Sequence, residues 1–172
     1  MGEGEIARAI AEARSWVTTN RSEARYRDDA ASAVIDDGLR VQVTAPDGRS
    51  IVTDMTAGVG GGGSAPSPGW LLRAANASCI ATLIAMRAAE LGARLDGLEV
   101  VVDSESDDAG LLDVDPSVPP GPLSMRVAVR VAGASVADDE VRAIVTWGVE
   151  QCPVCDAVKR AVPVEVAIAV GG

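Results

Sequence analysis

The sequence predicts an α+β fold in which helices pack on a largely antiparallel sheet. Short stretches of alternating apolar and polar residues, which indicate strands, recur along the chain. Between them lie stretches whose apolar residues recur at helical spacing. The predicted order is one helix, a β-hairpin, a long helix, two strands, further helices and a final strand.

Length and composition fit a single domain over residues 1–172, since 48% of the residues are apolar and can fill a core. The net charge of −10 argues against binding to nucleic acid or to an anionic membrane, both of which favour basic surfaces. The N-terminus has neither a basic region nor a hydrophobic signal core, which indicates a cytoplasmic protein. The longest uncharged stretch, between Arg73 and Arg87, is too short to span a bilayer.

The first third of the chain predicts a helix followed by a hairpin. Residues 4–18 carry apolar side chains at helical spacing. Asp36-Asp37-Gly38 predicts a turn, and residues 39–44 then alternate as a half-buried strand. Residues 45–48, Ala-Pro-Asp-Gly, predict the hairpin turn that leads to a second strand over residues 50–54.

A glycine-rich segment precedes the most apolar helix. Residues 59–68 predict a loop that enters a helix over residues 67–92, with Ser67 as N-cap, Pro68 at the first helical position and Gly92 at the end. The loop has neither the GxGxxG pattern nor a Gly-Lys-Ser/Thr ending, so the sequence does not favour a phosphate site.

The second half predicts strands that flank loops and helices. An acidic segment at 103–108 and a proline-rich segment at 113–122 read as solvated loops. The remaining predicted elements are strands at 98–103, 125–131 and 162–170 and helices at 138–150 and 152–160.

Sulfur redox chemistry is the leading candidate for activity. The chain has three cysteines, Cys79, Cys152 and Cys155, and no histidine, so a Ser-His or Cys-His nucleophile cannot be built. A structural zinc site needs four ligands, usually cysteine or histidine, so no bound metal is expected. In a reducing compartment the thiols stay free, and any disulfide is transient and catalytic.

Two of the cysteines, Cys79 and Cys155, also have a purely structural interpretation. Periodicity alone favours Cys79 as a packed core residue, because free cysteine is among the most buried residue types. Cys152 and Cys155 form a CxxC pair at the start of a helix, which permits a local disulfide. Cys155 is either a small packed residue or a second resolving thiol that exchanges with Cys152.

Two motifs resemble those of the OsmC/Ohr superfamily. Ser67-Pro-Gly-Trp-Leu-Leu-Arg-Ala-Ala-Asn-Ala-Ser-Cys79 resembles the cysteine helix of that family, and Gln151-Cys-Pro-Val-Cys-Asp-Ala-Val resembles its second-cysteine segment. The second-cysteine segment and final strand together occupy residues 151–170. The likeness covers the chain from about residue 36 onward, and residues 1–20 form an extra N-terminal helix.

The resemblance implies an OsmC-like fold, an intertwined homodimer and a peroxidase that reduces organic hydroperoxides in oxidative or osmotic stress. By the same resemblance Cys79 is the peroxidatic residue and Cys152 is the resolving one. No bound cofactor is implied, and an external dithiol, in the family typically a lipoyl group, serves as reductant.

The sequence departs from the family pattern at the residues that activate the cysteine. Gly69 stands where the peroxidases have a glutamate, and Arg27, or else Arg25, is the nearest match to their activating arginine. Two alternatives therefore stay open: a non-catalytic OsmC-like binding protein, and a CxxC dithiol redox protein that uses Cys152 and Cys155.

Trp70 and Trp147 are candidates for substrate binding. The chain has only four aromatic residues. The simplest interpretation of both tryptophans is that they are large side chains of the core or of an interface. Organic hydroperoxides need an apolar pocket for their alkyl group, and these tryptophans could line one.

Overall fold

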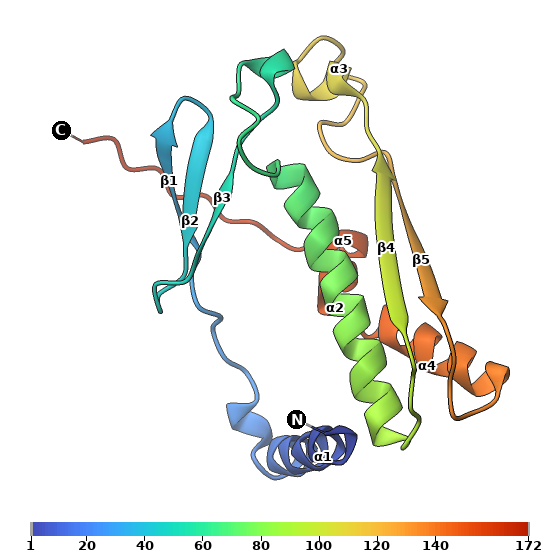
Figure 1. The fold of residues 1–172 in the computed structure, drawn as a ribbon. Coiled ribbons are helices and arrows are strands. Elements are labelled where there is room, and N and C mark those ends of the chain that lie inside the picture. Colours follow the sequence, from blue (N-terminus) through green and yellow to red (C-terminus); the bar gives the residue numbers. More distant parts are fainter. Residues whose placement is uncertain (1, 172) are drawn as a thin grey trace.

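The computed structural model describes residues 2–171 and confirms the predicted mixture of helices and antiparallel strands (Figure 1). The helices are α1 (Glu3–Thr19), α2 (Pro68–Glu90), α3 (Asp108–Leu111), α4 (Asp138–Glu150) and α5 (Pro153–Lys159), with 3₁₀ turns η1 (Arg21–Glu23) and η2 (Ala57–Val59). The strands are β1 (Ser32–Asp37), β2 (Arg40–Thr44), β3 (Ser50–Thr53), β4 (Leu98–Glu105) and β5 (Ser124–Val131).

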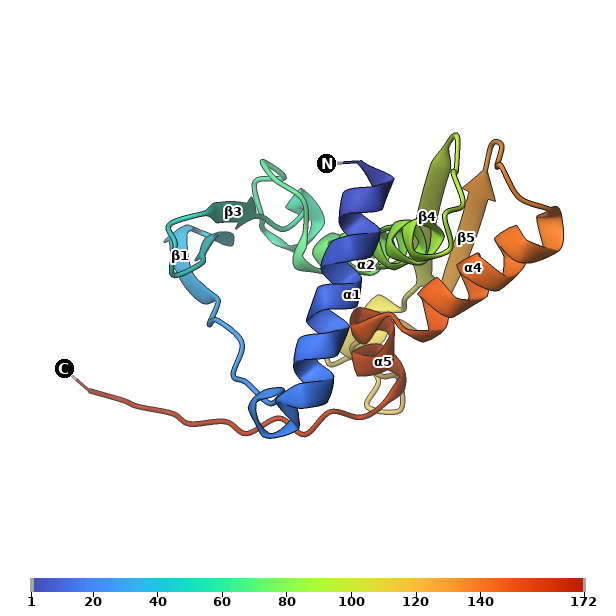
Figure 2. The ribbon, with the colours of Figure 1, turned by 90° about the horizontal axis from the view of Figure 1, so that it is seen from below.

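Helix α2 is the centre of the molecule. The antiparallel pair β4–β5 lies along one side of it, α4 packs against it, and α1 crosses near its C-terminal end (Figures 1 and 2). An ion pair between Arg14 and Glu90 joins α1 to α2. Four elements, α1, α4, α5 and β4, thus pack on the single helix that carries Cys79.

The ends of α2 follow from local sequence signals. The Ser67 hydroxyl accepts a hydrogen bond from the Trp70 N–H at 3.2 Å, and Pro68 begins the helix. Gly92 follows the last turn with φ of +65°, a conformation that costs glycine little. By length and composition alone this 23-residue helix could cross a membrane, a test that the central helix of a globular fold also passes. Helix α2 extends beyond the uncharged stretch between Arg73 and Arg87, and both arginines lie within the helix.

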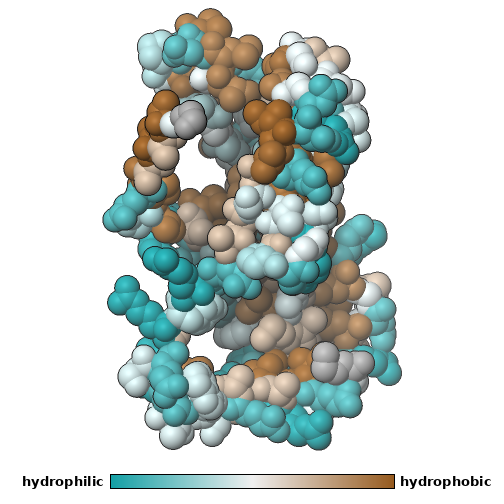
Figure 3. Space-filling view, turned by 90° about the vertical axis from the view of Figure 1, so that its left-hand side faces the viewer, coloured by the Kyte–Doolittle hydropathy of each residue, from teal (hydrophilic) through white to brown (hydrophobic). Residues whose placement is uncertain are grey.

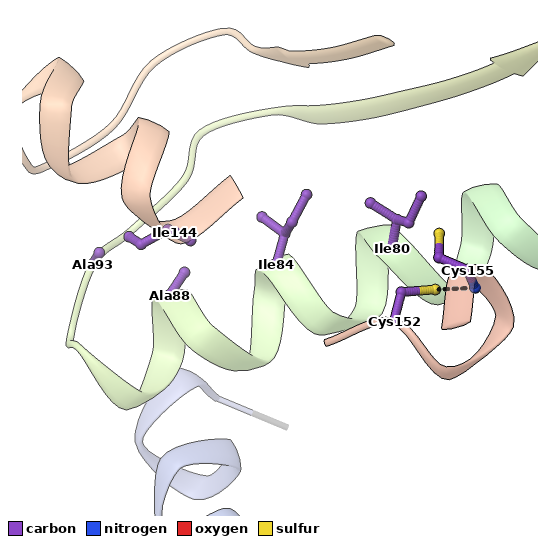
Figure 4. Close-up of a cluster of buried hydrophobic side chains, with 7 residues drawn as sticks. All are labelled: Ile80, Ile84, Ala88, Ala93, Ile144, Cys152 and Cys155. Atoms are coloured by element: carbon purple, nitrogen blue, oxygen red, sulfur yellow. Dashed lines mark hydrogen bonds between the residues drawn. The ribbon is translucent and has the colours of Figure 1, made fainter. Parts of the chain in front are cut away.

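The core lies where α2 meets α4 and α5. Ile80, Ile84 and Ile144 are fully buried, and Cys152 and Cys155 join the same cluster (Figure 4). Burying such side chains contributes about 1.5–3 kcal/mol each. The core therefore extends to the two cysteines of the CxxC motif.

The glycine-rich loop is held by one buried carboxylate. Asp54, 3% exposed, accepts hydrogen bonds from the backbone N–H groups of Met55 at 2.7 Å, Gly62 at 3.3 Å and Ser64 at 2.9 Å, and from the Ser64 hydroxyl at 2.8 Å. These bonds hold the pKa of Asp54 below its usual range. At Gly61 a Cβ would lie 2.0 Å from the Met55 carbonyl oxygen, so only glycine fits. The loop is thus an ordered entry to α2.

The three-stranded sheet β1–β2–β3 stands apart from α2 (Figures 1 and 2). The hairpin turn at 45–48 is confirmed, with Gly48 donating to Ala45 at 3.0 Å. Strand β1 was missed in the sequence: Asp36 and Asp37, predicted as part of a turn, are its last residues, and the turn lies at Gly38-Leu39. All residues of β1 are exposed. The acidic segment was also placed wrongly, because β4 continues to Glu105 through its pairing with β5.

The predicted final strand at residues 162–170 does not form in the single chain. This segment, the tail, is extended and exposed, and it runs away from the body of the molecule (Figure 2). Val164, Val166 and Ile168 are 83%, 78% and 83% exposed. The alternating pattern is a strand pattern, but a strand also needs a hydrogen-bonding partner, and none of the strands described in residues 2–171 pairs with the tail.

Candidate functional site

The three cysteines meet where α5 packs against α2. Cys79 lies on α2, half-buried and in contact with the core. Cys152 is the N-cap residue of α5 and is fully buried, and Cys155 lies one turn further along, 7% exposed. Pro153 occupies the first helical position, which starts α5 immediately after Cys152. The fold therefore brings together three thiols from two segments 73 positions apart (152 − 79).

Cys152 is the thiol that most readily carries a negative charge. Burial acts to raise its pKa, but the Cys155 backbone N–H, 3.3 Å from its sulfur (Figure 4), and the neighbouring Cys79 thiol lower the pKa below the usual range. Hydrogen bonds to a thiolate favour the charged form. A Cys152 thiolate is therefore held among donors in the core.

The pKa values of the other two thiols move in the opposite direction. Burial and the hydrogen bond to Cys152 raise the pKa of Cys79, which the backbone N–H of Val154 partly offsets. Burial and the interaction with Cys152 raise the pKa of Cys155 to about 11. Cys79 and Cys155 are therefore the proton donors of this cluster, which we call the thiol cluster (Cys79, Cys152 and Cys155).

Asn76 is a site residue that the sequence analysis missed. It is 2% exposed on α2, and its Oδ1 accepts a hydrogen bond from the Cys155 sulfur at 3.1 Å. A buried polar side chain with a specific partner is costly to remove. The available signal was an asparagine three positions before Cys79 on the apolar helix, which places both residues on neighbouring turns.

A groove of about 160 Å³ opens beside the thiol cluster. Asn76, Met125, Val127, Cys155, Val158 and Lys159 line it. Its walls are mostly apolar, with the Lys159 ammonium contributing a positive charge. Within the thiol cluster, Cys155 is the member that lines this groove.

The predicted activating arginines do not reach Cys79 within the chain. Arg27 and Arg25 lie in the exposed segment between η1 and β1, which both views place away from α2 (Figures 1 and 2). No arginine contributes to the pKa shift of Cys79. The segment leads toward the separate three-stranded sheet, which draws both arginines away from the thiol cluster. Arg73 instead donates to the Ser104 hydroxyl at 3.1 Å.

The two tryptophans are placed far from each other. Trp70, 49% exposed, lines an open groove of about 390 Å³ together with Asp54 and Arg73. Trp147 packs under Arg87, whose guanidinium carbon lies 5.1 Å from the ring centroid. Trp70 and Arg87 are 17 positions (87 − 70) and hence about 25 Å apart on the same helix. The single chain therefore does not line one pocket with both tryptophans.

Within residues 2–171, no three His, Cys, Asp or Glu side chains are placed to hold a metal ion. The polar groups that surround the sulfurs are backbone N–H groups and the Asn76 amide. The N–H group that donates to the Cys152 sulfur stabilises a thiolate, and the Asn76 oxygen accepts from the Cys155 thiol, so the arrangement suits thiol and disulfide chemistry.

Solved structures of low sequence identity share this fold. An organic hydroperoxide resistance protein OsmC from Legionella pneumophila matches with a TM-score of 0.59, 20% identity and coverage of 78% of this chain and 91% of that chain. The OsmC-like protein from Mycoplasma pneumoniae matches with a TM-score of 0.66, 11% identity and coverage of 78% of this chain and 89% of that chain. OhrB of Bacillus subtilis, an organic hydroperoxide resistance protein, matches with a TM-score of 0.52, 19% identity and coverage of 77% of this chain and 91% of that chain.

Sequence comparison assigns the family. None of the curated proteins matches this sequence. The family profile described as OsmC-like protein matches residues 61–167, more than half of the chain, and this match includes α2 and the thiol cluster. The chain therefore belongs to the OsmC-like family.

Proposed function

We propose that the protein is a thiol-dependent peroxidase of organic hydroperoxides in which Cys79 attacks and Cys152 resolves. The observation that carries the proposal is that Cys79 of α2 packs against the core cluster that contains Cys152, close enough for each thiol to affect the pKa of the other. Neighbours of the same fold are named organic hydroperoxide resistance proteins, which supports the substrate class.

The attacking sulfur is assigned by access. Cys152 is fully buried, whereas Cys79 is half-buried, so a peroxide can reach Cys79 first. The attacking species must be a thiolate. The pKa of Cys152 is lowered, so its thiolate is the base that lies beside Cys79. Because the pKa of Cys79 is raised, taking the Cys79 proton is uphill, and the reaction with peroxide draws the transfer forward.

The reaction then balances in two steps. The Cys79 thiolate attacks the terminal oxygen of ROOH, the O–O bond breaks, and the alkoxide takes a proton from Cys152 to leave as ROH. The Cys152 thiolate next attacks the Cys79 sulfenic acid and expels hydroxide, which leaves as water after protonation. One peroxide is reduced and two thiols are oxidised to a disulfide, which an external dithiol reduces.

The same proposal includes a cytoplasmic location and a homodimer. The tail and strand β1 expose a row of valines and isoleucines on the face of the molecule that Figure 3 shows, where apolar side chains gather around the three-stranded sheet. Exposed apolar strands of this kind favour pairing with another chain. A second copy would supply the partner that the tail lacks.

A Cys79→Ser variant tests the peroxidase. With dithiothreitol as reductant, it should consume cumene hydroperoxide no faster than buffer, because the serine hydroxyl is not a competent nucleophile toward the O–O bond. Ser78→Ala, at the adjacent exposed position, should retain wild-type turnover. Turnover that survives Cys79→Ser contradicts the proposal. A wild-type protein that leaves the peroxide unreduced would favour the non-catalytic binding protein.

A further inference from the structure

The CxxC motif contains one more sulfur than a two-cysteine peroxidase cycle needs. Two hydrogen bonds fix the position of Cys155. Its thiol donates to the Oδ1 atom of the buried Asn76, and its backbone N–H donates to the Cys152 sulfur. It also lines the groove beside the thiol cluster. These three contacts give Cys155 a defined position between the buried Cys152 and the surface.

We propose that Cys155 is a third redox residue, which takes the disulfide over from Cys79 and presents it to an external dithiol in the groove of Asn76, Val127, Val158 and Lys159. The proposal rests on the peroxidase function, because that reaction supplies the Cys79–Cys152 disulfide. In this scheme Cys155 takes part in disulfide exchange, and the external dithiol enters through the groove.

The exchange step follows from the order of the sulfurs. The Cys155 thiol loses its proton to solvent, and its thiolate attacks the Cys152 sulfur of the Cys79–Cys152 disulfide. A Cys152–Cys155 bond forms, the Cys79–Cys152 bond breaks, and the expelled Cys79 thiolate takes up a proton. No electrons are gained or lost by the protein, and Cys79 is again free to meet peroxide.

The reduction step follows from the lining of the groove. Cys152 is fully buried, whereas Cys155, although only 7% exposed, forms part of the groove wall, so a dithiol seated in the groove meets Cys155. Attack on Cys155 expels Cys152, whose thiolate is stabilised by the Cys155 N–H. A thiol of lower pKa is the better leaving group, so the pair is oriented for cleavage from the groove. The second thiol of the dithiol then closes its own disulfide, which returns Cys155 as a thiol.

Disulfide mapping over time separates the two steps. Reduced protein receives one equivalent of cumene hydroperoxide, is quenched with N-ethylmaleimide at successive times, and is mapped by mass spectrometry. We expect the Cys79–Cys152 disulfide first and its conversion to Cys152–Cys155 later. In Cys155→Ser the first disulfide should form at the wild-type rate and then persist. A wild-type Cys79–Cys152 disulfide that persists with Cys155 still reduced overturns the proposal.

Reduction from the groove gives a second readout. Dithiothreitol should reduce oxidised Cys155→Ser at least about tenfold more slowly than wild type, because attack must then occur at Cys79, which does not line the groove. Val101→Ala is the matched control: this exposed valine of β4 lies outside the groove, and the variant should be reduced at the wild-type rate. Equal rates for wild type and Cys155→Ser contradict the proposed entry route.

The pH dependence excludes a merely structural role for Cys155. Because burial raises the pKa of Cys155, the exchange rate should keep rising with pH beyond the range in which an ordinary exposed thiol becomes fully ionised. Forming the first disulfide with diamide in place of peroxide tests the relay independently. If diamide-oxidised protein shows the exchange and peroxide produces no disulfide, the peroxidase function fails and the relay stands. If peroxide produces Cys79–Cys152 and neither oxidant leads to Cys152–Cys155, the relay fails and the peroxidase stands.

Discussion

At the scale of single residues, polar groups in apolar surroundings decide what the molecule can do. Asn76 and Asp54 are almost completely buried, and each holds a segment in place: Asn76 the Cys155 side chain, Asp54 the glycine-rich loop. The chemistry of the thiols depends on the same kind of contact, since backbone N–H groups lower the pKa of Cys152. A small number of hydrogen bonds therefore sets both geometry and reactivity.

We predict that Asp54→Asn loosens the loop at neutral pH. The asparagine keeps one acceptor oxygen but loses the charge, so the N–H groups of Gly62 and Ser64 should exchange with solvent faster, as measured by hydrogen exchange. Asp47→Asn, in the hairpin turn, is the control and should leave these two amides unchanged.

The same loop should respond to acid. The pKa of Asp54 is lowered from 3.8 in the folded protein, so its stabilising contribution is fully present above that value and is lost as the pH falls through the lower folded pKa. Protection of the Ser64 amide in wild type should therefore fall only at pH values below 3.8. An acid response of equal size in Asp54→Asn would rule out this carboxylate as its cause.

What the sequence could predict at this scale was limited to residues with a strong local signal. Cys79 and Cys152 come together as the motifs implied. Asn76 was missed because its burial results from α5 packing on α2, which no local pattern reveals. Arg27 was assigned from its position along the chain, and the path of the chain in space carries it elsewhere.

At the scale of elements, small residues set how closely helices approach. Gly148 of α4 crosses α2 at Ile84, and a Cβ on Gly148 would lie 2.5 Å from the Ile84 Cγ1 atom and 3.0 Å from its backbone nitrogen. This close approach brings α4, and with it α5, onto the helix that carries Cys79. The position of the thiol cluster therefore depends on a contact that only glycine allows.

Gly148→Ala should accordingly lower the free energy of unfolding by about 1–3 kcal/mol, because the added methyl group forces α4 away from α2. Urea denaturation measures this change. Gly4→Ala is the control, since a Cβ at that helical position meets no atom within 4 Å and alanine favours helix. Stability unchanged in Gly148→Ala would mean that the two helices can separate without cost.

Elements were predictable where their signals are local. The boundaries of α2 and α4 agree with the sequence because caps and apolar periodicity lie within each helix. Strand β1 and the tail could not be predicted from local signals, because whether an extended segment becomes a strand is decided by its partner. Strand β1 pairs with β2, whereas the tail pairs with none of the described strands.

At the scale of the whole molecule, the single chain leaves two apolar surfaces uncovered, the tail and the three-stranded sheet (Figure 3). A Val164→Asp/Ile168→Asp double variant should be monomeric by analytical ultracentrifugation, whereas the wild type should sediment as a dimer. Both side chains lie on one face of the extended tail, and charge there opposes burial. Glu165→Lys alters the opposite face and should stay dimeric. A monomeric wild type, or a dimeric double variant, would contradict the proposed assembly.

Helix α5 connects the thiol cluster to the tail. It carries both cysteines of the CxxC motif, and only Arg160 and Ala161 separate it from the tail. A disulfide that draws α5 toward α2 therefore also shifts the start of the tail. In an assembly held by that segment, thiol oxidation and subunit affinity become thermodynamically linked. The linkage is reciprocal: oxidation changes the free energy of association by the same amount by which association changes the free energy of disulfide reduction.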